Sequence, residues 1–136
     1  MKLRLLASTP NVDALIATAM LTTTSGAAPS SLYHRLSANP AKVAEIVGRL
    51  EVQHGSILEH NRRDWLLEAG EGDVLKVMLE NRFFTFPRLG SNQWLLSANL
   101  RSVVEYAAEG GEFTELLLDS IKDRWPQVHA FGRRKP

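Results

Sequence analysis

Two apolar, strand-like segments joined by a short connection restrict the fold more than any other feature of the chain. The first covers residues 82–87, which are rich in aromatic side chains, and the second covers residues 93–98. The connection between them, residues 88–92, carries Gly90 and Asn92, which are typical of hairpin turns. Parallel neighbours would need a much longer crossover. The sequence therefore predicts an antiparallel pair of strands.

Periodicity along the rest of the chain predicts further strands and several helices. Residues 2–7 and 64–69 have the pattern of strands. Thr9-Pro10 and Asn39-Pro40 each resemble a helix start, with a capping residue followed by proline at the first helical position. Helical spacing continues from these two starts to about residues 22 and 54, and predicts other helices over residues 32–36, 74–80, 100–109 and 112–125. This order indicates the α+β class, with an antiparallel sheet and packed helices.

Composition fits one compact domain over residues 1–136, with a basic tail at residues 132–136. The chain is 44% hydrophobic and 23% charged, which favours a folded core over disorder. Its net charge of +1 argues against a dedicated nucleic-acid-binding protein, because such proteins usually carry a basic face. It has no cysteine, so disulfides, thiolate metal sites and a cysteine nucleophile are excluded.

No segment has the composition of a membrane span or a signal peptide. The apolar stretches are shorter than the length needed to cross a bilayer. The apolar run at residues 1–6 is too short for a secretory leader, so it fits a strand better. We therefore expect a cytoplasmic protein without a membrane partner.

Residues 54–60 concentrate polar groups where a predicted helix gives way to a strand. They contain His54, Ser56, Glu59 and His60. Sites often form where regular elements end. The histidine and glutamate spacing does not match known zinc motifs, so no metal site is expected. Ser56 could serve as a nucleophile with a histidine base, although no nucleophile elbow surrounds it, or it could cap a helix together with Glu59.

A second polar segment follows the predicted strand at residues 93–98. Asn99 and Arg101 lie at its end. Asn99 could cap the next helix, and Arg101 could form a surface ion pair. Equally, an arginine suits a phosphate or the edge of a planar ligand. The functional interpretation requires this segment to lie beside residues 54–60.

Both polar segments resemble the flavin-dependent thymidylate synthase family. Residues 53–60, Gln-His-Gly-Ser-Ile-Leu-Glu-His, are similar to that family's H-x-S/T-x-x-E-H segment. Residues 94–102, Trp-Leu-Leu-Ser-Ala-Asn-Leu-Arg-Ser, are similar to its W-x-x-N-x-R-S segment. The opening strand and the alanine-rich helix after Thr9-Pro10 also resemble the start of that family.

The resemblance implies a homotetramer that binds FAD at the junctions between subunits. The positions matching its flavin-binding residues are His54, Ser56, Glu59, Asn99 and Arg101. It also implies reductive methylation of dUMP to dTMP, with a folate as carbon donor and a uracil nucleotide as substrate. No catalytic residue is assigned.

Two features depart from the family pattern. The R-H-R-x-x-S signature is absent between the two matching segments, and Gly110 occupies a position where an arginine is expected. We therefore expect thymidylate synthesis to be lost or altered. The alternative is a non-catalytic oligomeric protein that binds a nucleotide or flavin. A small hydrolase using Ser56 and His60 has no further support.

Aromatic residues provide a separate reason to expect self-association. Five of them, Trp65, Phe83, Phe84, Phe86 and Trp94, lie within about thirty residues of strand-rich chain. Alternation along strands sends some of these side chains to the sheet face that the helices leave open. We expect a symmetry mate to cover the resulting apolar patch.

Overall fold

The computed structural model describes residues 1–22, 24–49, 57–122 and 129. Strands and helices alternate irregularly along the chain, as the predicted α+β class requires. Their bounds, in chain order, are β1 (Lys2–Ser8), α1 (Val12–Thr22), α2 (Pro29–Ser37), α3 (Pro40–Val47), β2 (Arg62–Glu68), α4 (Glu71–Glu80), β3 (Arg88–Gly90), β4 (Gln93–Asn99), α5 (Leu100–Tyr106) and α6 (Glu112–Ile121).

The four strands form one antiparallel sheet in the order β1-β2-β4-β3. The predicted fold class and antiparallel pairing are therefore confirmed. β2 and β4 occupy the centre, and their register pairs Arg62 with Asn99. The start of β2 consequently lies beside the end of β4, which decides where the candidate site forms.

The hairpin before β4 differs from its predicted boundaries. Residues 82–87 were expected to pair with β4, but among them only Thr85 forms a bridge, to Ser97. The strand that completes the sheet is β3, within the expected connection, and the turn falls at Ser91 and Asn92. Asn92 adopts a φ of 57°, which such a turn requires. Pro87 lacks the N–H that a longer ladder would use.

The two predicted helix starts had different outcomes. The cap at Asn39 is confirmed, because its side chain accepts a hydrogen bond from the Lys42 N–H at 3.2 Å. The start at Thr9-Pro10 is wrong, because α1 begins at Val12. The Thr9 hydroxyl instead accepts the Arg62 N–H at 3.0 Å, so it joins β1 to β2. The expected continuation of α3 to residue 54 is wrong, because the helix ends at Val47 and a turn follows at Gly48 and Arg49. α6 is described to Ile121, and the end expected for it at residue 125 lies outside the described residues.

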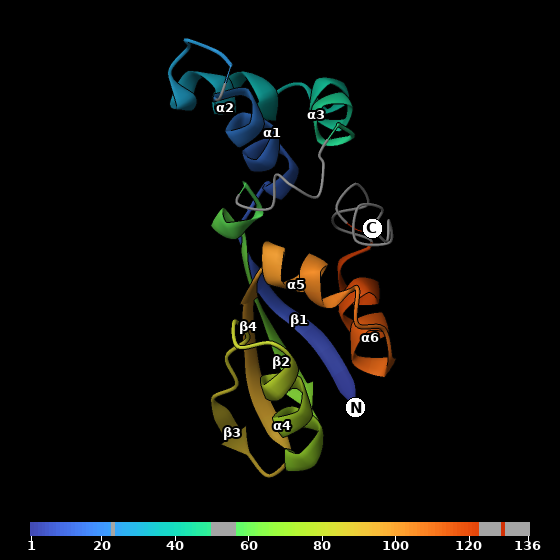
Figure 1. Cartoon of the computed structure of the whole chain (residues 1–136). Coiled ribbons are helices and arrows are strands. Elements are labelled where there is room, and N and C mark those ends of the chain that lie inside the picture. The colour runs from blue at the N-terminus through green and yellow to red at the C-terminus, as the bar shows by residue number, and fades with distance from the viewer. Residues whose placement is uncertain (23, 50–56, 123–128, 130–136) are drawn as a thin grey trace.

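The helices occupy two regions of the molecule (Figure 1). α1, α2 and α3 pack together beyond one end of the sheet, whereas α4, α5 and α6 lie along it. One face of β2 and β4 is buried through alternate residues, including Trp65, Leu67, Leu96 and Ala98. Within the described ranges, no helix combines the length and apolar character needed to cross a bilayer.

The aromatic side chains are buried more completely than alternation along the strands predicts. Trp65, Phe84, Phe86 and Trp94 are all at most 9% exposed, whereas Phe83 is 53% exposed. The expected aromatic patch on the open sheet face is therefore wrong. The segment carrying the phenylalanines leaves the ladder, and Phe84 and Phe86 pack inward together at a ring-centroid distance of 6.4 Å.

Candidate functional site

The two polar segments singled out from the sequence lie side by side at one end of the sheet. Residues 57–60 form a short 3₁₀ turn that leads into β2. The carbonyl of Asn61 then accepts a hydrogen bond from the Leu100 N–H at 2.8 Å. This contact fixes Glu59 close to the start of α5. The required proximity of the two segments is confirmed for their described residues, while His54 and Ser56 lie outside them.

Arg101 joins the two segments through its side chain. Its Nη1 donates to the Glu59 carboxylate, and its Nε donates to Glu105 at 2.9 Å. Hydrogen bonds to Glu105, and then to Glu59, raise the pKa of Arg101, so the guanidinium stays charged. One cation therefore faces two carboxylates. The ion-pair interpretation of Arg101 is correct, and the group keeps N–H donors beyond the two used here.

Asn99 caps α5, as one of its two interpretations predicts. Its Oδ1 accepts the Ser102 N–H at 2.9 Å and the Ser102 hydroxyl at 3.0 Å. The amide nitrogen takes no part in the cap, and it has no hydrogen-bond partner among the described residues. This nitrogen is a hydrogen-bond donor on a residue that lines the same cavity as Arg101. Capping and ligand contact are therefore compatible at Asn99.

A cavity of about 170 Å³ lies over these residues. Its lining combines one guanidinium, two carboxylates, an amide and one aromatic ring. The lining residues are Glu59, Phe83, Asn99, Arg101, Ser102 and Glu105. The Phe83 ring is more than half exposed, and the Arg82 guanidinium lies 5.0 Å from its centroid. A planar ligand could stack on such a ring.

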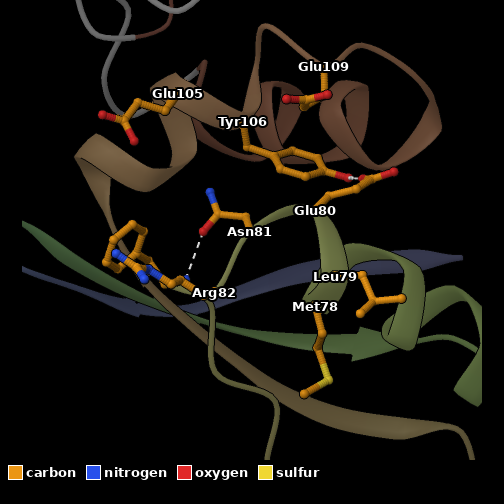
Figure 2. A pocket seen from close by; sticks show the side chains of 9 residues that line it. Met78, Leu79, Glu80, Asn81, Arg82, Glu105, Tyr106 and Glu109 are labelled. Atoms are coloured by element: carbon orange, nitrogen blue, oxygen red, sulfur yellow. Dashed lines mark hydrogen bonds between the residues drawn. The ribbon is translucent and has the colours of Figure 1, made fainter.

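A larger hollow of about 400 Å³ adjoins this cavity and shares Phe83 and Glu105 with it. Figure 2 shows the hollow between the end of α4 and α5. Across it, the Tyr106 hydroxyl donates a hydrogen bond to Glu80. Burial, and then Glu80, raise the pKa of Tyr106, so it remains a protonated donor. Glu109 adds a further carboxylate to the lining.

Buried polar groups lie behind the site at the start of β2. Arg63 is fully buried and near Asp13 in the first turn of α1. Burial lowers the pKa of Arg63 to about 10, and Asp13 opposes that fall. Burial raises the pKa of Asp13, and Arg63 opposes that rise. Asn61 is also fully buried, and its side chain has no hydrogen-bond partner among the described residues.

Sequence reasoning missed several residues that line the cavities. Glu105 could have been found, because a glutamate four residues after Arg101 lies on the same helix face. Phe83 was noticed only as an aromatic residue, and the Tyr106–Glu80 contact carries no sequence signal. His60 is exposed. The described part of the chain has no cluster of three histidines or carboxylates able to hold a metal.

Comparison with known proteins identifies the fold. No family model and no curated protein matches this sequence. Among solved structures, the flavin-dependent thymidylate synthase ThyX from Helicobacter pylori, complexed with FAD and dUMP, superposes with a TM-score of 0.70. The match covers 95% of this chain and 98% of that one, at 11% identity. The chain has the ThyX fold.

The chemistry of the described residues fits one part of FAD better than another. The Phe83 face, the Asn99 amide nitrogen and the Arg101 guanidinium suit a planar ring with carbonyl edges. The pyrophosphate fits poorly, because Glu59 and Glu105 already engage the arginine. These residues therefore fit the flavin ring.

Proposed function

We propose that this chain binds FAD through its flavin ring at the cavity over Glu59, Asn99 and Arg101. The observation that carries the proposal is the Glu59–Arg101 ion pair, since it joins both motif segments within a ThyX fold. In this proposal Phe83 stacks on the ring, and Asn99 and Arg101 donate to its carbonyl edge. His54 and Ser56 remain proposed flavin contacts on the resemblance alone.

The proposal separates flavin binding from thymidylate synthesis. A bound flavin would supply redox chemistry, while the protein would orient the ring and set its electrostatic surroundings. Phosphate and folate substrates need positive charge, and the cavity provides one arginine for two carboxylates. Reductive methylation of dUMP is therefore proposed to be lost or altered. The homotetramer and the cytoplasmic setting remain proposals of the same kind.

The alternative is the non-catalytic oligomeric protein, here in the form that uses the same fold to bind a nucleotide or nothing in place of a flavin. The small cavity favours it, because ligand pockets usually enclose roughly 300–1,000 Å³. The absent R-H-R-x-x-S signature favours it as well.

Visible absorption distinguishes the two proposals. FAD and riboflavin are titrated separately into the purified protein, and the flavin bands and fluorescence are followed. Binding at the ring predicts that riboflavin binds with an affinity close to that of FAD, because every contact proposed for the described residues is to the ring and none is to a phosphate. If neither compound changes its absorption bands or fluorescence on adding protein, and neither stays with the protein on gel filtration, flavin binding is contradicted and the alternative is supported.

A further inference from the structure

The larger hollow, between the end of α4 and α5, has a lining that the proposed flavin does not account for. Its volume of about 400 Å³ falls within the range of roughly 300–1,000 Å³ that is usual for small-molecule sites. It shares Phe83 and Glu105 with the cavity over Arg101, but the rest of its lining belongs to it alone. The hollow is therefore large enough to be a binding site in its own right.

One wall of this hollow is apolar and open to solvent. Met78 and Leu79, near the end of α4, are 49% and 80% exposed, and Phe83 follows them. These three side chains are half of the six exposed large hydrophobic residues in the described chain. Exposed apolar residues gathered around a hollow are typical of ligand-binding grooves. The wall therefore suits the hydrocarbon body of a ligand.

The remainder of the lining carries more carboxylates than cations. Glu80, Glu105 and Glu109 line the hollow, against the single guanidinium of Arg82. In Figure 2, Glu80 and Glu109 lie above Met78 and Leu79. Glu109 is exposed and forms no ion pair with a described residue. The hollow thus places an uncompensated carboxylate opposite an apolar wall.

A second hollow of about 240 Å³ continues the negative charge toward the start of α6. Glu80, Tyr106 and Glu109 line both hollows, so the two meet at these residues. Across both, two cationic side chains and the amino group of Met1 face five carboxylates, those of Asp73, Glu80, Glu105, Glu109 and Glu112. Because the whole chain has a net charge of +1, this negative charge is a local concentration.

Tyr106 lies where the two hollows meet, and its ring is fixed by packing. The ring lies 5.4 Å from that of Phe84 and 5.5 Å from that of Phe113, measured between centroids. Burial raises the pKa of its hydroxyl, and the charges of Glu80 and Glu109 raise it further. The polar end of the hollow therefore has a fixed position and a negative potential, which favours a positively charged group.

We propose that this hollow binds a small organic amine in its cationic form, with its hydrocarbon body on Met78, Leu79 and Phe83 and its ammonium group beside Glu80 and Glu109. An ammonium group has three donors, so one group can engage two carboxylates. A metal ion fits less well, because no three histidines or carboxylates of the described chain are placed to hold one. The inference stands without a flavin.

Ligand-detected NMR titration of the full chain tests the charge and the apolar body separately. Phenethylammonium combines both features, phenethyl alcohol and hydrocinnamate are its neutral and anionic counterparts, and methylammonium has the charge alone. We expect phenethylammonium to bind a few-fold or more tightly than the other three. Its affinity should fall as salt is added, because mobile ions screen exposed charges. Undetectable binding of phenethylammonium, or equal binding of the alcohol, overturns the inference.

Variants of the two walls locate the binding. Glu109→Gln removes the uncompensated charge, and Leu79→Gln replaces the most exposed apolar side chain. The matched controls are Glu68→Gln on β2 and Leu89→Gln on β3, which lie outside both hollows. All four positions are exposed, so circular dichroism should show folded proteins. Each wall variant should raise the dissociation constant for phenethylammonium a few-fold, and the controls should leave it unchanged. Equal affinities in wall and control variants overturn the site.

Titration of FAD into the same variants separates this inference from the proposed function. Glu109 and Leu79 do not line the cavity over Arg101, so their variants should bind FAD as wild type does. A Glu109→Gln variant that loses FAD and keeps phenethylammonium would assign the hollow to the flavin and overturn the separate site. A wild type that binds phenethylammonium but not FAD supports this inference and contradicts only the proposed function.

Discussion

Arg101 donates a hydrogen bond to Glu59 across a separation of 42 residues in the sequence. This contact ties the turn before β2 to the first turn of α5, and it gives both motif segments a shared structural role. It also limits the chemistry of the site, because Glu105 engages the same guanidinium. The positive charge of Arg101 is therefore balanced before any ligand arrives.

Substituting Arg101 and substituting one of its carboxylate partners should change the affinity for FAD in opposite directions. Arg101→Ala should weaken FAD binding several-fold, because it removes a charge-assisted hydrogen-bond donor from the cavity. Glu105→Gln should strengthen it a few-fold, because it frees part of the cation for the ligand. Fluorescence titration of FAD measures both changes.

The control for these titrations is Arg35→Ala, which removes an exposed arginine from α2. It should leave FAD affinity unchanged. Wild type and Arg101→Ala binding FAD equally well would show that Arg101 lies outside the flavin site.

Thymidylate synthesis by the purified chain is expected to be absent or weak. The cavity lining lacks the cations that would stabilise a nucleotide phosphate and the charge that develops on the uracil ring. The assay supplies FAD, a reductant, a methylene-folate and dUMP, with the Helicobacter pylori ThyX as positive control. Clear formation of dTMP would show that residues outside the described part of the site provide this chemistry.

Much of the fold followed from local patterns in the sequence. The spacing of apolar residues located β1, β2, β4 and the helices, and the short hairpin established antiparallel pairing. Errors arose where tertiary contacts outweighed local preference. Thr9 was expected to cap α1, but pairing of β1 with β2 uses its hydroxyl to satisfy the Arg62 N–H. No local sequence pattern indicates that the Thr9 hydroxyl will bond to Arg62 instead of capping α1.

The site was predictable to a smaller extent. The positions of Glu59, Asn99 and Arg101 at the ends of elements indicated that they would meet. Their partners were harder to predict, because Phe83 reaches the cavity only when residues 82–87 leave the sheet ladder. The exposed face of α4 was also missed, since Val74 and Val77 alone satisfy an amphipathic helix pattern.

Substitutions at Asn99 can separate its cap from its contact with a ligand. Asn99→Ala removes the acceptor for Ser102 and should destabilise the protein by about 1 kcal/mol. Asn99→Asp keeps an acceptor for the cap but replaces the amide donor with a third carboxylate. It should therefore keep near wild-type stability and lose FAD affinity. Urea unfolding and FAD titration measure the two effects, and unchanged FAD affinity in Asn99→Asp would assign the residue to capping alone.

The pair of half-buried Asp13 and buried Arg63 predicts a pH dependence of stability. Burial raises the pKa of Asp13 above its ordinary value of 3.8. The folded state then binds the proton more tightly than the unfolded state does. The contribution of Asp13 to stability is fully present below pH 3.8 and is lost as pH rises through the raised pKa. Wild-type protein should therefore lose stability relative to Asp13→Asn across this window.

Chemical unfolding of wild type and Asp13→Asn at about pH 4 and about pH 7 measures the effect. Removing the carboxylate also takes the Asp13 charge away from buried Arg63, which lowers the stability of the variant. Because the pKa of Arg63 is about 10, this residue stays charged at both pH values, and its contribution cancels between them. The stability of wild type minus that of Asp13→Asn should then be larger at the acidic pH. An equal difference at both values would mean that Asp13 titrates alike in the folded and unfolded chain.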